Sequence, residues 1–158
     1  MLDKLEKLMT TRAPAAALLV RIAVGWIFLS EGIQKFMYPE ALGAGRMAKI
    51  GIPWPEVMGP FVGSVEILCG ALVLFGLLTR LAAVPLTLTM LVALVSTKLP
   101  ILLGQGFWGF SLMNLPSYGF WTMAHESRTD LSMLLGALFL LAVGAGPWSL
   151  DARITGRR

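Results

Sequence analysis

The chain has 158 residues, of which 56% are hydrophobic and 14% are charged, and its formal net charge at pH 7 is +4. A soluble domain of this size could not bury so much apolar surface, so the composition excludes an ordinary soluble protein. The basic residues lie mostly at the ends of apolar runs, which disfavours a nucleic-acid-binding face and indicates a protein embedded in a lipid bilayer.

Four apolar runs predict four transmembrane helices, because a spanning helix needs roughly 20 mostly apolar residues. The stretch MLDKLEKLMTTRAP before the first run lacks a cleavable signal pattern and is expected to form a short amphipathic lead-in. The breaker-rich stretch Gly51-Ile52-Pro53-Trp54-Pro55 precedes the second run, and a tight Thr79-Arg80 link follows it. Gly144-Ala145-Gly146-Pro147 stops the last run. The predicted spans are residues 15–37, 56–78, 81–99 and 130–146. We therefore expect an all-α fold in which residues 1–158 form one membrane domain, a four-transmembrane-helix bundle.

The predicted connection between the third and fourth helices, residues 101–129, is long and aromatic. A structureless stretch of that length is uncommon, so part of it should dip into the membrane or lie along it as a short helix. Aromatic side chains are typical of the headgroup layer. Those in this loop are Phe107, Trp108, Phe110, Tyr118, Phe120 and Trp121.

The distribution of lysine and arginine predicts the orientation of the bundle. With four spans, eight basic residues fall on the side of the two termini and five on the other side. Because cytoplasmic loops carry the excess of basic residues, we expect a multi-pass protein of the cell (inner) membrane with both termini in the cytoplasm.

One cysteine, Cys69, and one histidine, His125, limit the cofactors that this sequence could hold by itself. A single thiol forms no internal disulfide or dithiol redox pair, and a single histidine excludes paired-histidine haem ligation. A metal site built from Glu31, Glu66, His125 and Glu126 has no spacing signature, so we predict no metal. Any electron carrier would therefore have to be supplied from outside this chain.

Glu66 lies near the middle of the second run, where an ionised carboxylate costs roughly 2.5–3.5 kcal/mol on insertion scales. Gly59, Gly63, Glu66 and Gly70 share one stripe of the helix, so the carboxylate should face the bundle interior, where another helix approaches closely. Counting helical rise places Arg21 within reach of it. Two interpretations stay open: a structural Arg21–Glu66 pair, and a pair that also serves a ligand.

A second group of charges lies toward the other face. Glu31 and Lys35 are spaced as a favourable helical pair, which could be only an exposed pair at a helix end. Counting helical rise places Glu31, Lys98 and Asp130 at nearly equal depth, which favours one polar pocket instead.

The adjacent residues His125 and Glu126 fall just beyond that depth, with Arg128. A histidine beside a carboxylate can relay protons near neutral pH, although a lone loop histidine is more often simply solvated.

Six motifs spread over nearly the whole chain form a recognisable set. They are residues 21–28 (RIAVGWIF), 31–36 (EGIQKF), 51–53 (GIP), 65–70 (VEILCG), 76–80 (GLLTR) and 148–151 (WSLD). As a set they resemble the DoxX family of small four-helix membrane proteins. Many members carry histidine where Glu31 stands, so a carboxylate replaces an imidazole here.

The resemblance implies a link with membrane redox systems, including quinone-coupled sulfur oxidation and oxidative-stress complexes. We expect a quinone-interacting or accessory subunit of a membrane oxidoreductase, which would use the diffusible quinone of the bilayer and an oxidoreductase partner. Protons would pass through Glu66, Glu31 and His125, and the ligand would contact Arg21, Lys35, Lys98, Glu126 and Asp130. The alternatives are a small transporter working as a homo-oligomer and a non-catalytic membrane scaffold.

Overall fold

The computed structural model describes residues 9, 11 and 13–156, and this part of the chain is helical without any strand. The predicted lead-in falls largely outside the described residues. Three segments are long and apolar enough to cross a membrane: α2 (Ala17–Met37), α4 (Pro55–Phe75) and the continuous helical segment Thr79–Leu103. The prediction of an all-α membrane protein is therefore confirmed.

The third of these segments continues past its predicted end at residue 99. It consists of α5 (Thr79–Ala93), the π-helical turn η1 (Leu94–Lys98) and α6 (Leu99–Leu103). In the π turn the N–H of Leu99 donates to the carbonyl of Leu94, five residues earlier. A proline ring normally clashes with the carbonyl four residues before it, and the wider turn lets the helix pass Pro100.

The last long helix, α7 (Phe120–Val143), starts well before the predicted position at residue 130. The prediction was wrong here because hydropathy marks only the apolar part of a helix, whereas the polar turns from His125 to Asp130 are also helical. The predicted aromatic connection of residues 101–129 therefore shortens to residues 104–119. The structure also adds two short helices that the sequence did not predict, α3 (Ala44–Ile50) and α8 (Leu150–Ile154).

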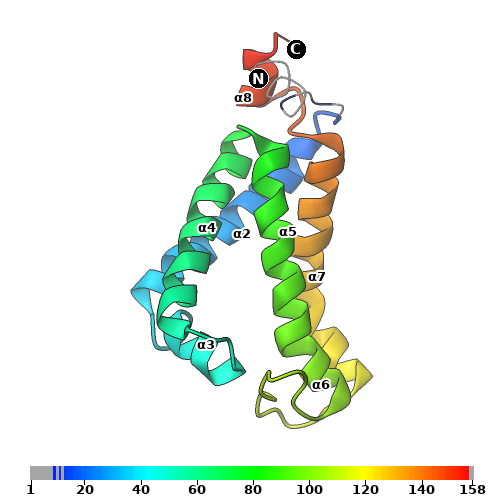
Figure 1. Ribbon diagram of the computed structural model, residues 1–158. Helices are drawn as coiled ribbons and strands as arrows, with labels where there is room; N and C mark the ends of the chain where they lie inside the picture. Colours follow the sequence, from blue (N-terminus) through cyan, green and yellow to red (C-terminus); the bar gives the residue numbers. More distant parts are fainter. Residues whose placement is uncertain (1–8, 10, 12, 157–158) are drawn as a thin grey trace.

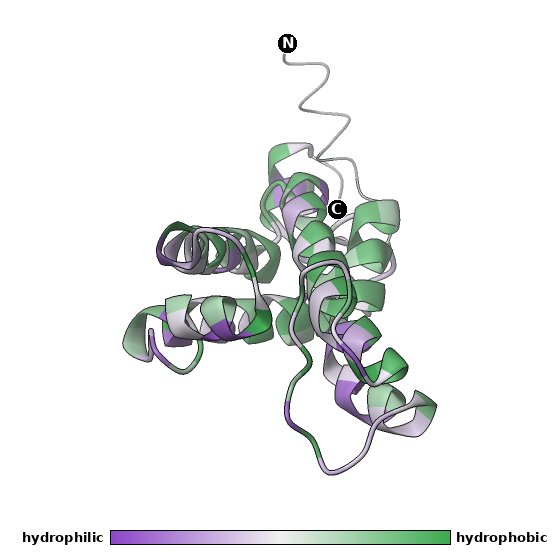
Figure 2. Cartoon of the chain, turned by 60° about the horizontal axis from the view of Figure 1, so that its bottom comes forward, coloured by the Kyte–Doolittle hydropathy of each residue, from purple (hydrophilic) through white to green (hydrophobic). Residues whose placement is uncertain are grey.

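The four long helical segments form two pairs, α2 with α4 and α5 with α7. The pairs meet at the end that carries α8 and diverge toward the end that carries α3 and α6 (Figure 1). We call these the narrow end and the open end. A buried core that includes Phe28, Val73, Leu86 and Leu140 fills the space between the pairs where they meet. The helices are largely hydrophobic along their length (Figure 2), as expected for surfaces that face lipid.

Glycines at two levels bring α2 and α4 into backbone contact. A Cβ atom on Gly70 would lie 2.7 Å from the backbone nitrogen of Leu29, and one on Gly32 would lie 2.7 Å from the carbonyl oxygen of Gly63. Small residues at such positions let membrane helices approach closely. This pair of helices is therefore fixed along most of its length.

Replacing Gly70 with alanine should force α2 and α4 apart, because the new methyl group would meet backbone rather than a movable side chain. We expect the free energy of unfolding to fall by at least about 2 kcal/mol. Titrating the protein from a mild detergent into sodium dodecyl sulfate, with circular dichroism as readout, measures this. The control is Ser64→Ala, at an exposed position of the same helix. Equal stability of the two variants would contradict the close approach.

Arg21 ties three segments together at the narrow end. Its guanidinium is 2% exposed and donates hydrogen bonds of 2.8–3.1 Å to the carbonyls of Val73, Leu74, Ala145 and Trp148. The first two carbonyls belong to the last turn of α4, where a cation also complements the negative end of the helix dipole. The other two lie in the segment that follows α7.

Asp151 of α8 completes the narrow end. Its carboxylate accepts hydrogen bonds from the backbone N–H groups of Leu78, at 2.7 Å, and Thr79, at 3.1 Å. These are donors that the first turn of α5 leaves without a partner. Burial raises the pKa of the Asp151 carboxyl above its ordinary value, and the N–H groups of Thr79 and Leu78 offset only part of that rise. Polar contacts thus fix the two helix pairs to each other at this end.

Candidate ligand-binding site

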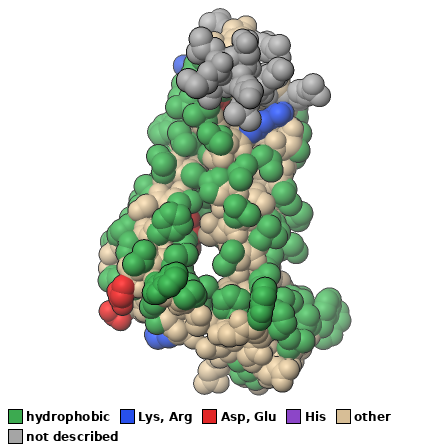
Figure 3. Space-filling model, in the orientation of Figure 1, with side chains coloured by type: hydrophobic (Ala, Val, Ile, Leu, Met, Phe, Trp, Pro, Cys, Tyr) green, Lys and Arg blue, Asp and Glu red, His purple; other side chains and the backbone are tan. Residues whose placement is uncertain are grey.

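The diverging helix pairs enclose a cavity of about 490 Å³ toward the open end. The surface is visibly hollowed between α4 and α5 (Figure 3). This volume falls within the range of small-molecule sites, roughly 300–1,000 Å³. Most of the lining is apolar, and the polar side chains that interrupt it are Glu31, Lys35, Arg46, Glu66, Thr89, Ser96, Thr97, Thr129 and Asp130.

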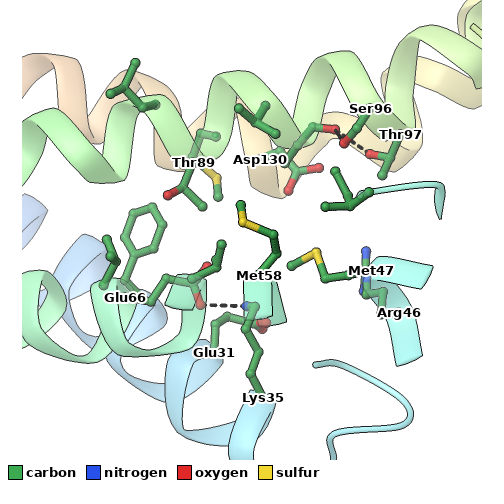
Figure 4. A pocket seen from close by; sticks show the side chains of 18 of the residues that line it. Glu31, Lys35, Arg46, Met47, Met58, Glu66, Thr89, Ser96, Thr97 and Asp130 are labelled. Atoms are coloured by element: carbon green, nitrogen blue, oxygen red, sulfur yellow. Dashed lines mark hydrogen bonds and ion pairs between the residues drawn. The ribbon is translucent and has the colours of Figure 1, made fainter. Parts of the chain in front are cut away.

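One wall of the cavity carries a buried ion pair between α2 and α4. Lys35 Nζ lies 2.6 Å from Glu66 Oε2, and Glu66 is 2% exposed (Figure 4). Glu31, one turn before Lys35 on α2, lines the same wall and is exposed. Glu66 faces the bundle interior, as the stripe of small residues around it predicted. The lysine and the exposed Arg46 of α3 make this the hydrogen-bond-donating wall.

A second ion pair joins the π turn to α7 on the other side of the cavity. Lys98 Nζ lies 3.0 Å from Asp130 Oδ2. Asp130 lines the cavity, whereas Lys98 is buried behind it and orients its carboxylate. Each ion pair lies within one helix pair, and among the described residues no ion pair crosses the cavity.

Three hydroxyl groups complete the wall formed by α5 and the π turn. Thr89 donates to the carbonyl of Pro85 at 3.0 Å, and Thr97 donates to that of Ala93 at 2.6 Å, with Ser96 directed to the same carbonyl at 3.5 Å. Because each hydroxyl hydrogen is used on its own helix, the oxygen lone pairs are left to accept from a ligand. This is the hydrogen-bond-accepting wall.

The structure places four of the predicted site residues at one cavity: Glu31, Lys35, Glu66 and Asp130. Lys98 supports Asp130 from behind. Three predicted residues, Arg21, His125 and Glu126, do not line the cavity.

The predicted Arg21–Glu66 pair is wrong, because Glu66 pairs with Lys35 and Arg21 binds carbonyls at the narrow end. Helical side chains lean toward the N-terminus of their own helix, which turns Arg21 away from Glu66 and Lys35 toward it.

His125 is exposed on α7, not in a loop as predicted. Five residues along a helix correspond to a rotation of about 140°, so a helix that turns Asp130 into the cavity turns His125 away from it. Its neighbour Glu126 also lies outside the lining. The predicted proton relay through these two residues has no support in this geometry.

Several lining residues were missed by sequence reasoning. The sequence assigns Arg46 only to the five basic residues on the far side of the predicted bundle, and it points to no role for Thr89, Ser96 and Thr97. A signal existed for the last two, because a Ser-Thr-Lys run directly before Leu99-Pro100 is unusual in an apolar segment. Proline-induced widening of a helix often marks a functional position.

Long apolar helices packed through glycine, with charged side chains turned into an internal cavity, define an α-helical membrane protein. The model of the DoxX family matches residues 16–99, and the chain belongs to the DoxX family.

The chain is also similar in sequence to two named proteins. The chain is 53% identical over 151 residues to Uncharacterized membrane protein Rv3486 of Mycobacterium tuberculosis, which covers 96% of this chain and 88% of that protein. It is 36% identical over 83 residues to Putative oxidoreductase CatD of Bacillus subtilis, which covers 52% of this chain and 59% of that protein. No solved structure matches the chain.

Proposed function

We propose that this protein is a quinone-interacting accessory subunit of a membrane oxidoreductase system. The observation that carries the proposal is the chemistry of the cavity. An apolar space of about 490 Å³ between lipid-facing helices presents a donating wall with Lys35 opposite an accepting wall with Ser96 and Thr97. A quinone and its quinol form are lipid-soluble and carry two oxygens on opposite sides of one ring. The donating wall can bind a quinone oxygen, and the accepting wall can bind an O–H group of the quinol.

The residues of the two walls have complementary roles in this proposal. Lys35 and Arg46 donate to a quinone oxygen, and the hydroxyl oxygens of Thr89, Ser96 and Thr97 accept from the O–H groups of the quinol form. Reduction of a quinone takes up two electrons and two protons. The electrons come from a partner oxidoreductase, and the carboxyl groups at the cavity hold and deliver the protons.

The similarity to CatD supports the redox assignment, because that protein carries the name Putative oxidoreductase and shares 36% identity over 83 residues with this chain. The cavity supports the same direction independently of any relative. Buried ionisable residues in membrane helices commonly mark sites of ligand or proton handling.

The fourth span and the orientation belong to this proposal. α7 packs along α5 and has 24 residues, so it is about 36 Å long and can cross a hydrocarbon core of about 30 Å. With α7 as the fourth span, the narrow end faces the cytoplasm by the excess of basic residues on that side. The open end, and with it the polar part of the cavity, then lies nearer the opposite face of the cell membrane.

Removing the hydroxyls of the accepting wall tests the proposal. We expect the variant Ser96→Ala/Thr97→Val to bind the quinol form about thirtyfold more weakly, because it removes two acceptors worth about 1 kcal/mol each. The measurement is the amount of quinone and quinol that copurifies in mild detergent per mole of protein, followed by anaerobic titration with added quinol.

The control is Thr87→Val. Thr87 lies on the same helix and donates to the carbonyl of Ala83 at 2.7 Å, as Thr97 does to Ala93, but it does not line the cavity. Thr87→Val should therefore keep the wild-type affinity for the quinol. An absence of quinone and quinol from the wild-type protein, or equal quinol affinities of the two variants, would reject the proposal in favour of transport or a scaffold.

A further inference from the structure

The exposed residues of the cavity lining fall into two chemically different groups. Those on α4 and α5 are all apolar: Phe61 is 58% exposed, Leu88 56% and Val92 52%. Those on the other elements are all polar: Glu31 of α2, Arg46 of α3 and Thr129 of α7. The cavity therefore has an apolar mouth between α4 and α5, formed by Phe61, Leu88 and Val92.

The deep part of the cavity has the opposite chemistry. Glu66, Ser96 and Thr97 line it and are 2%, 1% and 4% exposed. The lining therefore changes from lipid-facing apolar side chains at the mouth to fixed polar groups in the interior. This gradient matches an amphiphile that inserts its headgroup first.

The two ends of the cavity are closed to an apolar chain. At the narrow end the helix pairs are joined by the contacts of Arg21 and Asp151. At the open end α3 and the residues that flank it line the cavity, and the loop after α6 reaches them through a 3.0 Å hydrogen bond from the N–H of Ser111 to the carbonyl of Ile50. A hydrocarbon tail that leaves the cavity thus has its apolar exit between α4 and α5 (Figure 3).

We propose that the ligand is a tailed amphiphile that enters sideways from the bilayer between α4 and α5, with its hydrocarbon tail held in the apolar mouth at Phe61, Leu88 and Val92. The headgroup assignment rests on the proposed quinone function, whereas the sideways entry and the tail position rest on the mouth alone. The protein thus selects its ligand by tail as well as by headgroup. Soluble compounds that share the headgroup but lack a tail are weak ligands.

Two quinones with the same substituted ring, one with a decyl tail and one without, test the inference on the full-length protein in lipid nanodiscs. The wild-type protein should bind the decyl quinone at least about tenfold more tightly, after correction for partition into lipid, because the tail packs against Phe61, Leu88 and Val92 and the tail-less quinone lacks these contacts. The variant Leu88→Trp/Val92→Trp narrows the mouth. It should lose about tenfold in affinity for the decyl quinone and less than about twofold for the tail-less one.

The control is Leu91→Trp, because Leu91 is 44% exposed on the same helix and does not line the cavity. It should leave both affinities unchanged. Equal affinities of the wild-type protein for the two quinones, or equal losses for both in the narrowed variant, would overturn the tail position while leaving quinone binding intact.

Binding of neither quinone would reject the headgroup assignment, and a second measurement then decides the entry route. A bimane label at Thr89→Cys, in a Cys69→Ala background, reports from the cavity, and one at Leu91→Cys reports from the lipid face. A long-chain alcohol with a nitroxide near its headgroup should quench the first label saturably and the second in linear proportion to its mole fraction. Linear quenching at both positions would overturn the inference.

Discussion

Replacing Lys35 with methionine should lower the free energy of unfolding by about 3–5 kcal/mol, because it leaves the carboxylate of Glu66 buried without its partner. Glu66→Leu should destabilise the protein less. The remaining lysine belongs to the last turn of α2 and can extend its ammonium toward water at the open end. The double variant Lys35→Met/Glu66→Leu should lie within about 1 kcal/mol of the wild-type protein, since no unpaired charge remains.

Titration with sodium dodecyl sulfate measures all three variants, and the coupling energy follows from the double-mutant cycle. Lys49→Met is the control for loss of a positive charge, because Lys49 is exposed on α3. It should change stability by less than about 0.5 kcal/mol. Additive effects of the two single substitutions would show that Lys35 and Glu66 do not interact in the membrane.

Replacing Arg21 with leucine should destabilise the protein by at least about 4 kcal/mol. The guanidinium satisfies four carbonyls, and hydrogen bonds to charged groups contribute about 1.5–3 kcal/mol each without adding fully. Arg21→Lys keeps the charge but loses the planar fork of donors, so about half of the loss should remain. The helix pairs would separate first at the narrow end.

The same detergent titration gives the loss of stability, and hydrogen exchange locates it. Amides near Val73 and Ala145 should exchange faster in Arg21→Leu than amides of the cavity walls. The matched control is Arg153→Leu, an exposed arginine of α8. A uniform rise in exchange over the whole chain would show that Arg21 stabilises the bundle without acting locally on the narrow end.

The apolar pattern predicted the helices well because hydrocarbon requires every backbone polar group to be paired within a helix. The inward orientation of Glu66 was predictable for a related reason, since its glycine neighbours must face another helix. The start of α7 was not predictable from hydropathy. Its first turns are polar, and they pack against the π turn and α6, which hydropathy does not report.

The polar partners were the hardest feature to predict. Depth along a helix could be counted, and it correctly brought Glu31 and Asp130 to one cavity. Depth does not give the direction in which a long side chain leans. The sequence therefore predicts Arg21 as the partner of Glu66, whereas in the structure that partner is Lys35. The π turn at residues 94–98 was also invisible in the pattern, and with it the two hydroxyls that it turns toward the cavity.

The order in which the two ion pairs occur along the chain has a consequence for membrane insertion. Lys35 and Glu66 belong to the first two long helices, and Lys98 and Asp130 belong to the last two. During synthesis the first helical hairpin can therefore leave the translocon with its opposite charges already neutralised, before the second hairpin is made. The second hairpin then brings its own ion pair, Lys98 with Asp130. The four charged side chains therefore enter the bilayer in two steps, and in each step the two opposite charges cancel.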